Sequence, residues 1–340
     1  MATLAIMSLS FSAGAKAMIN NKKVKSCFVT GGAGFIGSHL VNKLVEKDCI
    51  VTVYDNLSSG KLEFINRHMS RNYFKLIQAD LLDFKALKQA LSGYDLVFHL
   101  AANPDVRAGI HNTNLDLKTG TIATYNVLEA MRLNGIGKLV FVSSSAVYGD
   151  AHLSLVSEHH GPLVPISLYG ASKLASEGLI SAFCNLFDMQ GWVYRLANAV
   201  GPRLTHGVIF DFMNKLKRDP KRLEILGDGT QQKSYIHVDD CINGIFFGLE
   251  NSKEMFNIFN LSSCSTTNVV DIADIVVKSL RLEEVEFTYT GGTSGWPGDV
   301  PQINLDTLKI NQLGWKPKYT SYEAVYHTVQ SLLDCNATYL

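Results

Sequence analysis

The chain has 340 residues, 46% of them hydrophobic, which is enough for about two domains with a sizeable core. Its 31 Lys and Arg residues equal its 31 Asp and Glu residues, so neither a basic surface for nucleic acid nor an acidic tail is expected. After the N-terminal segment, no apolar run reaches the roughly 20 residues that a membrane-spanning helix needs. The composition therefore indicates a globular protein that contacts neither nucleic acid nor membrane.

The cysteine and histidine residues indicate neither disulfides nor a metal site. The six cysteines form no C-x-x-C pair, which is typical of free thiols in the reducing cytoplasm. The cysteine positions are 27, 49, 184, 241, 264 and 335. His159 and His160 are adjacent, but neighbouring residues on a helix do not face one another, so no metal site is predicted.

The N-terminus begins with apolar and then small residues, MATLAIMSLSFSAGAKA. This segment looks like a signal peptide but lacks the positively charged region that starts one. A second methionine, Met18, stands a few residues before the first expected strand. We predict that residues 1–23 are a disordered extension and that residues 1–17 either belong to it or reflect a mis-assigned start.

From residue 24 onward, short strand-like runs alternate with helical patterns. Strands are expected at 26–30, 50–55, 74–80, 96–102, 138–145 and 191–198. Helices are expected at 36–47, at 126–135 and from about Tyr169 onward. This alternation predicts an α/β fold with a doubly wound, parallel, right-handed sheet of the Rossmann type.

After Gly201-Pro202 the alternation breaks down. Helical patterns at 206–218 and 269–280 mix with short strands at 223–226, 234–240 and 285–290, and a glycine-rich loop at 291–299 precedes the closing helices. We interpret this part as a smaller C-terminal α/β lobe. The predicted division assigns 24–200 and about 233–262 to the sheet domain, and 201–232 and 263–335 to the substrate-binding lobe.

A glycine-rich turn between the first strand and the first helix predicts a dinucleotide site. Gly31, Gly34 and Gly37 follow a G-x-x-G-x-x-G spacing, which allows close approach of the backbone to a pyrophosphate at a helix N-terminus. Asp55 ends the second strand, where a carboxylate can bind both ribose hydroxyls of NAD and repel a 2′-phosphate. No Arg follows it, so NAD is favoured over NADP. Asp80, at the end of the third strand, could contact the adenine or could simply cap a helix.

The segment PISLYGASK places Tyr169 and Lys173 four residues apart, on one face of the expected helix. By spacing alone, this pair could equally be a surface pair or a phenol activated by an ammonium group. Because a free tyrosine has a pKa of about 10, acting as a base near pH 7 requires stabilising the phenolate by roughly 4 kcal/mol. A neighbouring ammonium and an oxidised nicotinamide could together supply this.

Six motifs occur in a familiar order: TGGAGFIG, YDNLSSG, HLAA, SSSAVYG, YGASK and GDG followed by SYIHVDD. With these motifs, residues 24–317 resemble the extended short-chain dehydrogenase/reductase family, most closely its UDP-glucose 4-epimerase-like members. The resemblance implies that Tyr169 is the catalytic base, that Lys173 lowers its pKa and binds the nicotinamide ribose, and that Ser144 hydrogen-bonds the reacting sugar hydroxyl. It also implies a homodimer paired through the Tyr169 helix.

The resemblance implies two further sets of residues. The NAD-binding set is Gly31, Gly34, Phe35, Ile36, Gly37, Asp55, Asn56, Ser59, Gly60, Asp80, Leu81, Leu100, Ala101, Ala102, Tyr169 and Lys173. The substrate-binding set is Ser144, Ser145, Asn198, Val208, Leu226, Lys233, Tyr235 and Asp299.

Several positions depart from the family pattern. Lys233 stands where the family has a diphosphate-binding Arg, and Trp296 replaces a second Arg. Arg203 could compensate for them. Gly120 stands where many epimerases have Asn. Ile303 is intermediate between the bulky and small residues that the resemblance associates with glucose-restricted and N-acetyl-tolerant members, so N-acetyl tolerance is a hypothesis.

The resemblance implies a 4-epimerase that interconverts UDP-glucose and UDP-galactose, or the UDP-N-acetylhexosamine pair, through a 4-keto sugar with tightly bound NAD. Another NAD-dependent nucleotide-sugar enzyme remains open: a uronate 4-epimerase, decarboxylase, 4,6-dehydratase or reductase. Ser145 and Ala146 stand where the resemblance places the acidic residues of dehydratases and decarboxylases, which disfavours those two. A non-catalytic NAD-binding sensor or scaffold is the alternative of a different class.

Overall fold

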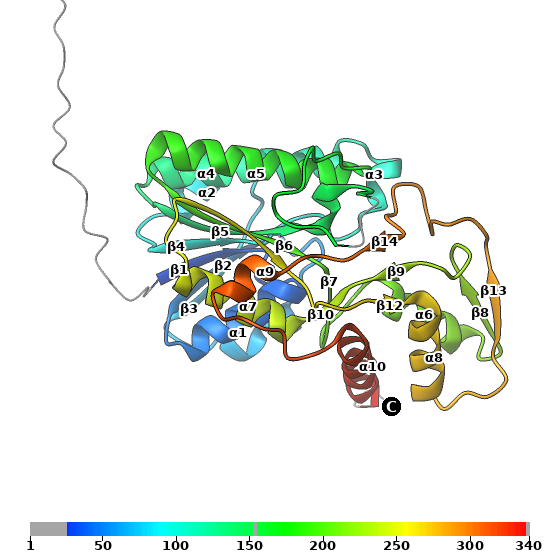
Figure 1. Ribbon diagram of the computed structural model, residues 1–340. Coiled ribbons are helices and arrows are strands. Elements are labelled where there is room, and N and C mark those ends of the chain that lie inside the picture. Colours follow the sequence, from blue (N-terminus) through cyan, green and yellow to red (C-terminus); the bar gives the residue numbers. More distant parts are fainter. Residues whose placement is uncertain (1–25, 152–154, 338–340) are drawn as a thin grey trace, which may run out of the picture.

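The structure is a computed structural model that describes residues 26–151 and 155–337 (Figure 1). The extension predicted for residues 1–23 lies outside the described residues. The described chain has a large parallel sheet covered by helices on both faces, and a smaller lobe at one end of that sheet (Figure 1).

The large sheet has seven strands, and every neighbouring pair is parallel. Its spatial order is β3 (Phe74–Gln78), β2 (Ile50–Asp55), β1 (Ser26–Thr30), β4 (Leu96–His99), β5 (Lys138–Ser144), β6 (Gln190–Leu196) and β11 (Phe256–Leu261). The order reverses at β1, which lies between β2 and β4, and ligands of such sheets bind at this switch point. The predicted doubly wound Rossmann fold is confirmed.

Helices cover both faces of the sheet. One face carries α2 (Phe84–Ala90), α4 (Ala123–Leu133) and α5 (Leu168–Phe187), and the other carries α1 (Phe35–Glu46) and α7 (Val238–Asn251) (Figure 1). Each face has its own apolar cluster, so residues such as Cys27, Phe28 and Val29 of β1 are completely buried. A strand buried on both faces is a near-continuous apolar run, which is why the sequence pattern located it.

The helices α2 and α7 and the strand β11 were not predicted. The strand expected at 234–240 ends at His237, and α7 begins at Val238. His237 caps α7 by accepting a hydrogen bond from the Asp239 backbone N–H at 3.3 Å. Asp239 and Asp240 in the first turn are acidic residues at a helix N-terminus, a favourable position that the strand-like pattern before them concealed.

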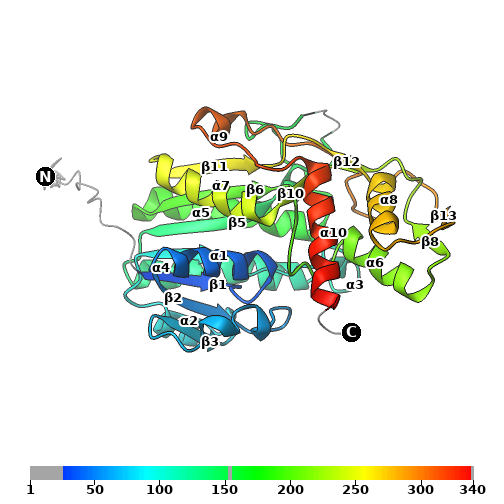
Figure 2. The ribbon, with the colours of Figure 1, turned by 90° about the horizontal axis from the view of Figure 1, so that it is seen from below.

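The smaller lobe contains three short sheets and three helices (Figure 2). The sheets are β7 (Asn198–Val200) with β10 (Tyr235–His237), β9 (Gln232–Lys233) with β12 (Thr267–Asn268) and β14 (Gln302–Ile303), and β8 (Arg222–Ile225) with β13 (Glu286–Tyr289). The helices are α6 (Val208–Arg218), α8 (Val269–Ser279) and α10 (Ser321–Ala337), which share a third apolar cluster. The remaining elements are α3 (Ala108–His111), α9 (Leu308–Gln312), the 3-10 turns η1 (Leu62–Phe64), η2 (Asn66–His68) and η4 (Ser145–Tyr148), and the π-helical turn η3 (Leu117–Ile122).

Candidate active site

The glycine-rich turn connects β1 to α1 at the switch point of the sheet. Gly31 has a φ of +69°, and a Cβ there would lie 2.6 Å from the backbone nitrogen of Ala101. A Cβ on Gly37 would lie 2.1 Å from the carbonyl oxygen of Gly31. Both glycines are therefore required for the backbone to pack this closely, as the spacing of the motif predicts.

The N-terminus of α1 faces this turn and is suited to an anion. Gly34 is the N-cap; within the described chain, no side chain caps the helix and no acidic residue occupies its first turn, which includes Phe35 and Ile36. The first backbone N–H groups of a helix have no partner inside the helix, and the helix dipole adds positive potential there. The turn thus has the geometry and the charge to hold a pyrophosphate.

Asp55 lies beside the turn at the end of β2, with only 8% of its surface exposed. Its Oδ2 accepts a hydrogen bond from the Ala33 N–H at 3.0 Å, and its Oδ1 accepts one from the Leu57 N–H at 2.9 Å. Each carboxylate oxygen can accept a further bond, so two ribose hydroxyls can still be bound. Gly60 packs against the carboxylate, since a Cβ there would lie 2.9 Å from Oδ1. Ser59 immediately precedes it in the same loop.

Asp80 is linked to the same region but does not cap a helix. Its Oδ2 accepts a hydrogen bond from Asn56 Nδ2 at 3.0 Å, and its Oδ1 accepts one from the Leu82 N–H at 2.8 Å. The N-cap of α2 is instead Asp83, whose Oδ1 accepts a bond from the Ala86 N–H at 3.0 Å. The capping interpretation of Asp80 is therefore wrong, and an adenine contact remains a prediction.

The remaining predicted NAD-binding residues surround the turn. Leu100, Ala101 and Ala102 follow β4, where the Leu100 N–H donates to the Thr30 carbonyl at 3.2 Å. Leu81 follows β3 and is 8% exposed. Together with the glycine turn and Asp55, these residues lie along the carboxyl ends of neighbouring strands.

Three predicted catalytic residues meet at the carboxyl end of β5. Tyr169 and Lys173 lie on α5, and the Lys173 Nζ is 5.8 Å from the centre of the Tyr169 ring. Ser144, the last residue of β5, hydrogen-bonds the Tyr169 side chain and accepts a bond from the Ala146 N–H at 3.2 Å. The structure thus brings Ser144, Tyr169 and Lys173 together, as the motif order predicts.

Within the chain, the electrostatics favour the protonated phenol. Burial raises the pKa of Tyr169 to about 12, the hydrogen bond from Ser144 lowers it, and the charge of Asp116 raises it. Burial lowers the pKa of Lys173 to about 8, against the charges of Glu177 and Asp116. The Lys173 Nζ donates to the Val142 carbonyl at 2.7 Å. The lowering of the Tyr169 pKa that the motif predicts therefore needs a positive charge beyond those of the protein.

His99, which is fully buried at the end of β4, is neutral. Its Nε2 is 3.0 Å from the Thr124 hydroxyl, which itself donates to the Gly120 carbonyl at 2.7 Å. The Thr124 oxygen must therefore accept from Nε2–H, and Nδ1 accepts from the Thr30 hydroxyl at 2.7 Å. Burial and the nearby Lys173 lower the pKa of His99 to about 3.

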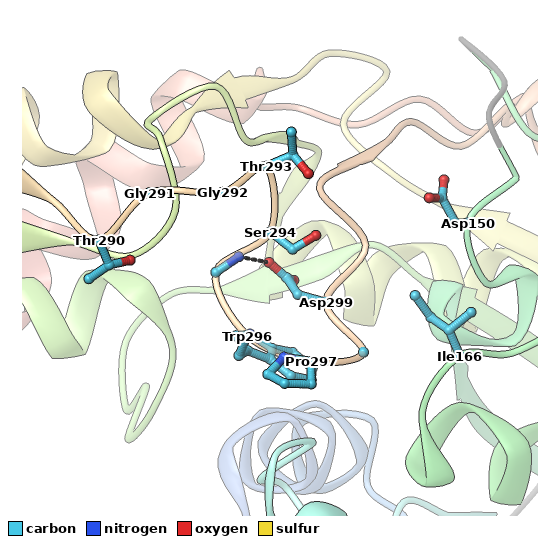
Figure 3. Close-up of a pocket in the computed structure, with 12 residues that line it drawn as sticks. Asp150, Ile166, Thr290, Gly291, Gly292, Thr293, Ser294, Trp296, Pro297 and Asp299 are labelled. Atoms are coloured by element: carbon cyan, nitrogen blue, oxygen red, sulfur yellow. Dashed lines mark hydrogen bonds between the residues drawn. The ribbon is translucent and has the colours of Figure 1, made fainter.

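On the side of the smaller lobe, the structure pairs two of the predicted substrate-binding residues. The Lys233 Nζ forms an ion pair with Asp299 Oδ1, and the Asp299 side chain is only 6% exposed. The other carboxylate oxygen accepts a hydrogen bond from the Gly295 N–H at 3.1 Å (Figure 3). Leu226 packs against Gly295, within 3.4 Å of where a Cβ would lie. Leu226 and Lys233 thus both contact the loop that ends at Asp299.

That loop, residues 290–299, borders a pocket of about 590 Å³. Asp150 and Ile166 face the loop across the pocket, and Trp296 lies on its wall (Figure 3). A Cβ on Gly298 would lie 3.0 Å from the Ile166 carbonyl oxygen, so the loop contacts the segment that leads into α5. The pocket therefore adjoins the helix that carries Tyr169.

The other predicted substrate residues are more dispersed. Asn198 and Tyr235 are partners in the parallel pair of β7 and β10, and Tyr235 is buried. Val208 is the first residue of α6, and Ser145 begins the turn η4. Ile303 is 7% exposed and belongs to a core cluster, so its side chain has little access to a sugar.

Two charged residues near Lys173 were not predicted from the sequence. Asp116 is 2% exposed, and its Oδ1 accepts a hydrogen bond from Asn103 Nδ2 at 3.1 Å. Glu177 is 3% exposed and lies four residues after Lys173. The spacing of Tyr169, Lys173 and Glu177 could have identified Glu177, because the three residues repeat at intervals of four on one helix.

The structure also gives a reason for Gly120. A Cβ at this position would lie 2.6 Å from the Ser172 Oγ on α5, so the close contact between η3 and α5 requires glycine. The helix that carries Tyr169 and Lys173 can therefore approach η3 more closely than a larger residue would allow.

Among the described residues, no cluster of three or more His, Cys, Asp or Glu side chains could hold a metal ion. No helix in the same part of the chain has the length and apolar character to cross a membrane.

The parallel sheet, the glycine turn and Asp55 define a Rossmann dinucleotide-binding protein, and Ser144, Tyr169 and Lys173 add a candidate reaction centre. The chain belongs to the NAD dependent epimerase/dehydratase family, which matches residues 27–262. It is thus an enzyme of that family, with NAD as its cofactor. The predicted family resemblance, the enzyme class and the cofactor are confirmed.

Solved structures and a curated relative show how far the similarity extends. A UDP-galactose 4-epimerase is 40% identical, with a TM-score of 0.81 over 91% of this chain and 99% of that one. A UDP-glucose 4-epimerase from Thermotoga maritima, solved with UDP-glucose, is 31% identical, with a TM-score of 0.83 over 92% and 99%. UDP-glucuronic acid decarboxylase 1 of Xenopus tropicalis is 28% identical over 92% of this chain and 73% of its own length.

Proposed function

We propose that the protein is a 4-epimerase of UDP-hexoses. The observation that carries this proposal is the meeting of Ser144, Tyr169 and Lys173 at the end of β5, beside the dinucleotide turn. The similarity to UDP-galactose and UDP-glucose 4-epimerases supports the choice of substrate class. The pair UDP-glucose and UDP-galactose is the first candidate, and the UDP-N-acetylhexosamine pair is the second.

The chain's own residues would bind the cofactor and move the proton. The turn from Gly31 to Gly37 would hold the pyrophosphate, Asp55 the adenosine ribose, and Lys173 the nicotinamide ribose. NAD, when bound, accepts and returns the hydride of sugar carbon 4. Its positive nicotinamide ring and the Lys173 ammonium would stabilise the Tyr169 phenolate, opposing the burial that raises its pKa to about 12.

In the proposed reaction, Tyr169 removes the proton of the sugar 4-hydroxyl while Ser144 holds that hydroxyl in place. The resulting 4-keto sugar would turn over so that carbon 4 presents its opposite face, and Tyr169 would return the proton to the carbon-4 oxygen. Each turnover leaves the cofactor in its starting oxidation state.

On the substrate side, we propose that Asp299, Lys233 and Leu226 bind the nucleotide, with Asn198, Val208, Tyr235 and Ser145 along the sugar and diphosphate. Trp296 adds an aromatic wall where the family pattern has an Arg. Arg203 lies beside α1, where its Nη1 donates to the Ser38 Oγ at 3.0 Å, and its remaining N–H groups keep it a second candidate cation for the diphosphate. Lys233 is the first.

Product analysis tests the proposal. The protein is incubated separately with UDP-glucose, UDP-N-acetylglucosamine and UDP-glucuronate, while NMR follows the sugar and absorbance follows NADH. The expected result is the carbon-4 epimer with no net NADH. Net NADH, carbon dioxide or a 4-keto-6-deoxy sugar would indicate one of the related NAD-dependent enzymes instead. An inert protein that still binds NAD would indicate a sensor or scaffold.

The ion pair between Lys233 and Asp299 leads to a prediction for substrate affinity. In a Lys233→Met variant, Asp299 would stay buried without its cation, so the free energy of unfolding should fall by up to about 3 kcal/mol. Loss of the charge should also raise the KM for UDP-glucose at least about tenfold. Thermal unfolding and initial rates measure both effects. The Lys233→Arg control keeps the charge and should retain a near-normal KM; equal KM values for the Met and Arg variants would contradict the role of the charge.

We further propose a homodimer formed through α4 and α5. Tyr125, Leu186 and Phe187 are 46%, 73% and 43% exposed, and the rings of Tyr125 and Phe183 make contact between the two helices. Such an exposed apolar surface is typical of an interface.

A Tyr125→Glu variant tests this interface. Burying a carboxylate there should convert the dimer to a monomer without loss of helix content. Light scattering measures the molar mass against that of the 37.4 kDa monomer. Tyr322→Glu is the matched control, because Tyr322 is 52% exposed on α10. A monomeric wild type, or a Tyr125→Glu variant that remains dimeric, would contradict the proposed interface.

The division of the chain into 24–200 with about 233–262, and 201–232 with 263–335, stays a prediction, as does a cytoplasmic location.

A further inference from the structure

A buried ion pair lies directly behind the candidate reaction centre. Glu177 of α5 and Arg195 of β6 are each 3% exposed. Three hydrogen bonds join them: Arg195 Nη2 to Oε2 at 2.7 Å, and Arg195 Nε to Oε1 and Oε2 at 3.1 and 3.2 Å. Burying two charges costs desolvation energy, and apolar residues at such sites are often equally stabilising. The pair therefore calls for a role beyond stability.

Glu177 extends the face of α5 that contacts the end of β5. Tyr169, Lys173 and Glu177 follow one another at intervals of four, so they share one side of the helix. Each contacts one of three consecutive residues of the strand. Tyr169 hydrogen-bonds Ser144, the Lys173 Nζ donates to the Val142 carbonyl at 2.7 Å, and the Ser143 hydroxyl donates to Glu177 Oε1 at 2.6 Å.

Arg195 holds Glu177 from the neighbouring strand. In the parallel pair of β5 and β6, Arg195 is the register partner of Ser143. Its Nη1 also donates to the Tyr148 hydroxyl at 3.0 Å, and that hydroxyl donates to Asn260 Oδ1 of β11 at 2.7 Å. The carboxylate of Glu177 is thus held by a network that includes three adjacent strands of the sheet.

The charges around Lys173 give this arrangement a chemical consequence. Glu177 and Tyr169 lie on the same helix as Lys173, Asp116 approaches from the segment before η3, and His99 approaches from β4. Burial lowers the pKa of Lys173 to about 8, while the charges of Glu177 and Asp116 raise it. His99 is neutral and contributes no charge. Near neutral pH, Lys173 therefore depends on the Glu177 and Asp116 carboxylates to remain in its ammonium form.

We propose that Glu177 and Arg195 are positioning residues for the reaction: Arg195 holds Glu177 against Ser143, which keeps Ser144 and Lys173 aligned with Tyr169 and maintains the ammonium form of Lys173. This inference rests on the proposed 4-epimerase function. It assigns no contact with the substrate to either residue.

A Glu177→Gln variant tests the charge. Glutamine keeps the length and the acceptor for Ser143 but loses the carboxylate. We expect kcat to fall by about 10- to 100-fold, the cost of a small misalignment, with a nearly unchanged KM for UDP-glucose. Because Lys173 would lose its proton at lower pH, the alkaline limb of the kcat profile should move down by about one pH unit.

Matched variants separate charge from geometry. Glu177→Asp keeps the negative charge on a side chain that is one methylene shorter. We therefore expect kcat to fall while the alkaline limb of the kcat profile stays at its wild-type pH. Glu129→Gln on α4 removes one partner of a solvent-exposed pair whose two hydrogen bonds are both 2.8 Å, and it should change neither quantity. A wild-type kcat and pH profile in both Glu177 variants would overturn the proposal.

Two measurements keep the test decisive if a variant or the function fails. If Glu177→Gln does not fold, the kcat values of Arg195→Lys and Glu177→Asp test the proposal instead. A folded variant with wild-type kcat would contradict the positioning role. If the wild type epimerises no UDP-hexose, the phenolate absorbance of Tyr169 is titrated in the NAD complex without sugar. A higher phenolate pKa in Glu177→Gln than in the wild type supports the proposal, and an identical titration overturns it.

Discussion

A Tyr169→Phe variant should lose about 10²- to 10⁴-fold in kcat, the usual contribution of a positioned acid or base. Phenylalanine keeps the ring, which packs 5.8 Å from the Lys173 ammonium, and removes only the hydroxyl that Ser144 contacts. The KM for UDP-glucose and the content of bound NAD should change little, because neither depends on the proton. Stopped assays of epimer formation measure the loss.

Two controls make this result specific. Ser144→Ala should lower kcat less than Tyr169→Phe, since it removes the group that holds the hydroxyl but leaves the base. Thermal unfolding should show that both variants fold. A Tyr169→Phe variant with full turnover would contradict the mechanism, and the proton would then need another acceptor.

A Gly37→Ala variant should lose bound NAD. The new Cβ would lie 2.1 Å from the Gly31 carbonyl oxygen and 2.9 Å from the Gly31 carbonyl carbon. Both are backbone atoms that cannot rotate away, so α1 must move from the turn. Overpacking of this kind costs about 1–3 kcal/mol and would misplace the N–H groups that face the pyrophosphate. The ratio of absorbance at the nicotinamide and protein bands after gel filtration measures the retained cofactor.

The matched control is Gly178→Ala on α5. This glycine is also helical, but no heavy atom lies within 4 Å of its Cβ position. Alanine there should stabilise the protein by about 0.5–1 kcal/mol through helix propensity and leave the NAD content unchanged. Full NAD retention by Gly37→Ala would show that the turn tolerates a side chain and would contradict the proposed cofactor site.

The parallel sheet could be predicted because its buried strands are apolar runs between helical patterns. Short elements with mixed patterns could not be found in this way. The helix α7 begins directly after a strand-like run, and α2 has only seven residues. Local patterns also left Asp80 open between an adenine contact and a helix cap, and only the structure excluded the cap, because Asp83 is the N-cap of α2.

The functional site can likewise be divided into residues that the sequence predicts and contacts that only the structure shows. Motif order located Ser144, Tyr169 and Lys173, since each lies at the end of a strand or on a helix face whose geometry is local. It could not show that Lys233 would pair with Asp299, which is 66 residues away. Nor could it show that Ile303 packs in a core cluster, with little access to a sugar.

The amino-acid sequence by itself determined the fold class, the dinucleotide turn and the order of the catalytic motifs, because these depend on short-range spacing of glycine, apolar and polar residues. The tertiary structure alone decided the charge environment of the reaction centre. Asp116 and Glu177 act on the charge of Lys173 from two separate segments, Arg195 holds Glu177 from a third, and the effect on Lys173 depends on burial and distance. Electrostatic interactions strengthen as water is excluded, so the chemistry of PISLYGASK is set by residues that meet only in the folded chain.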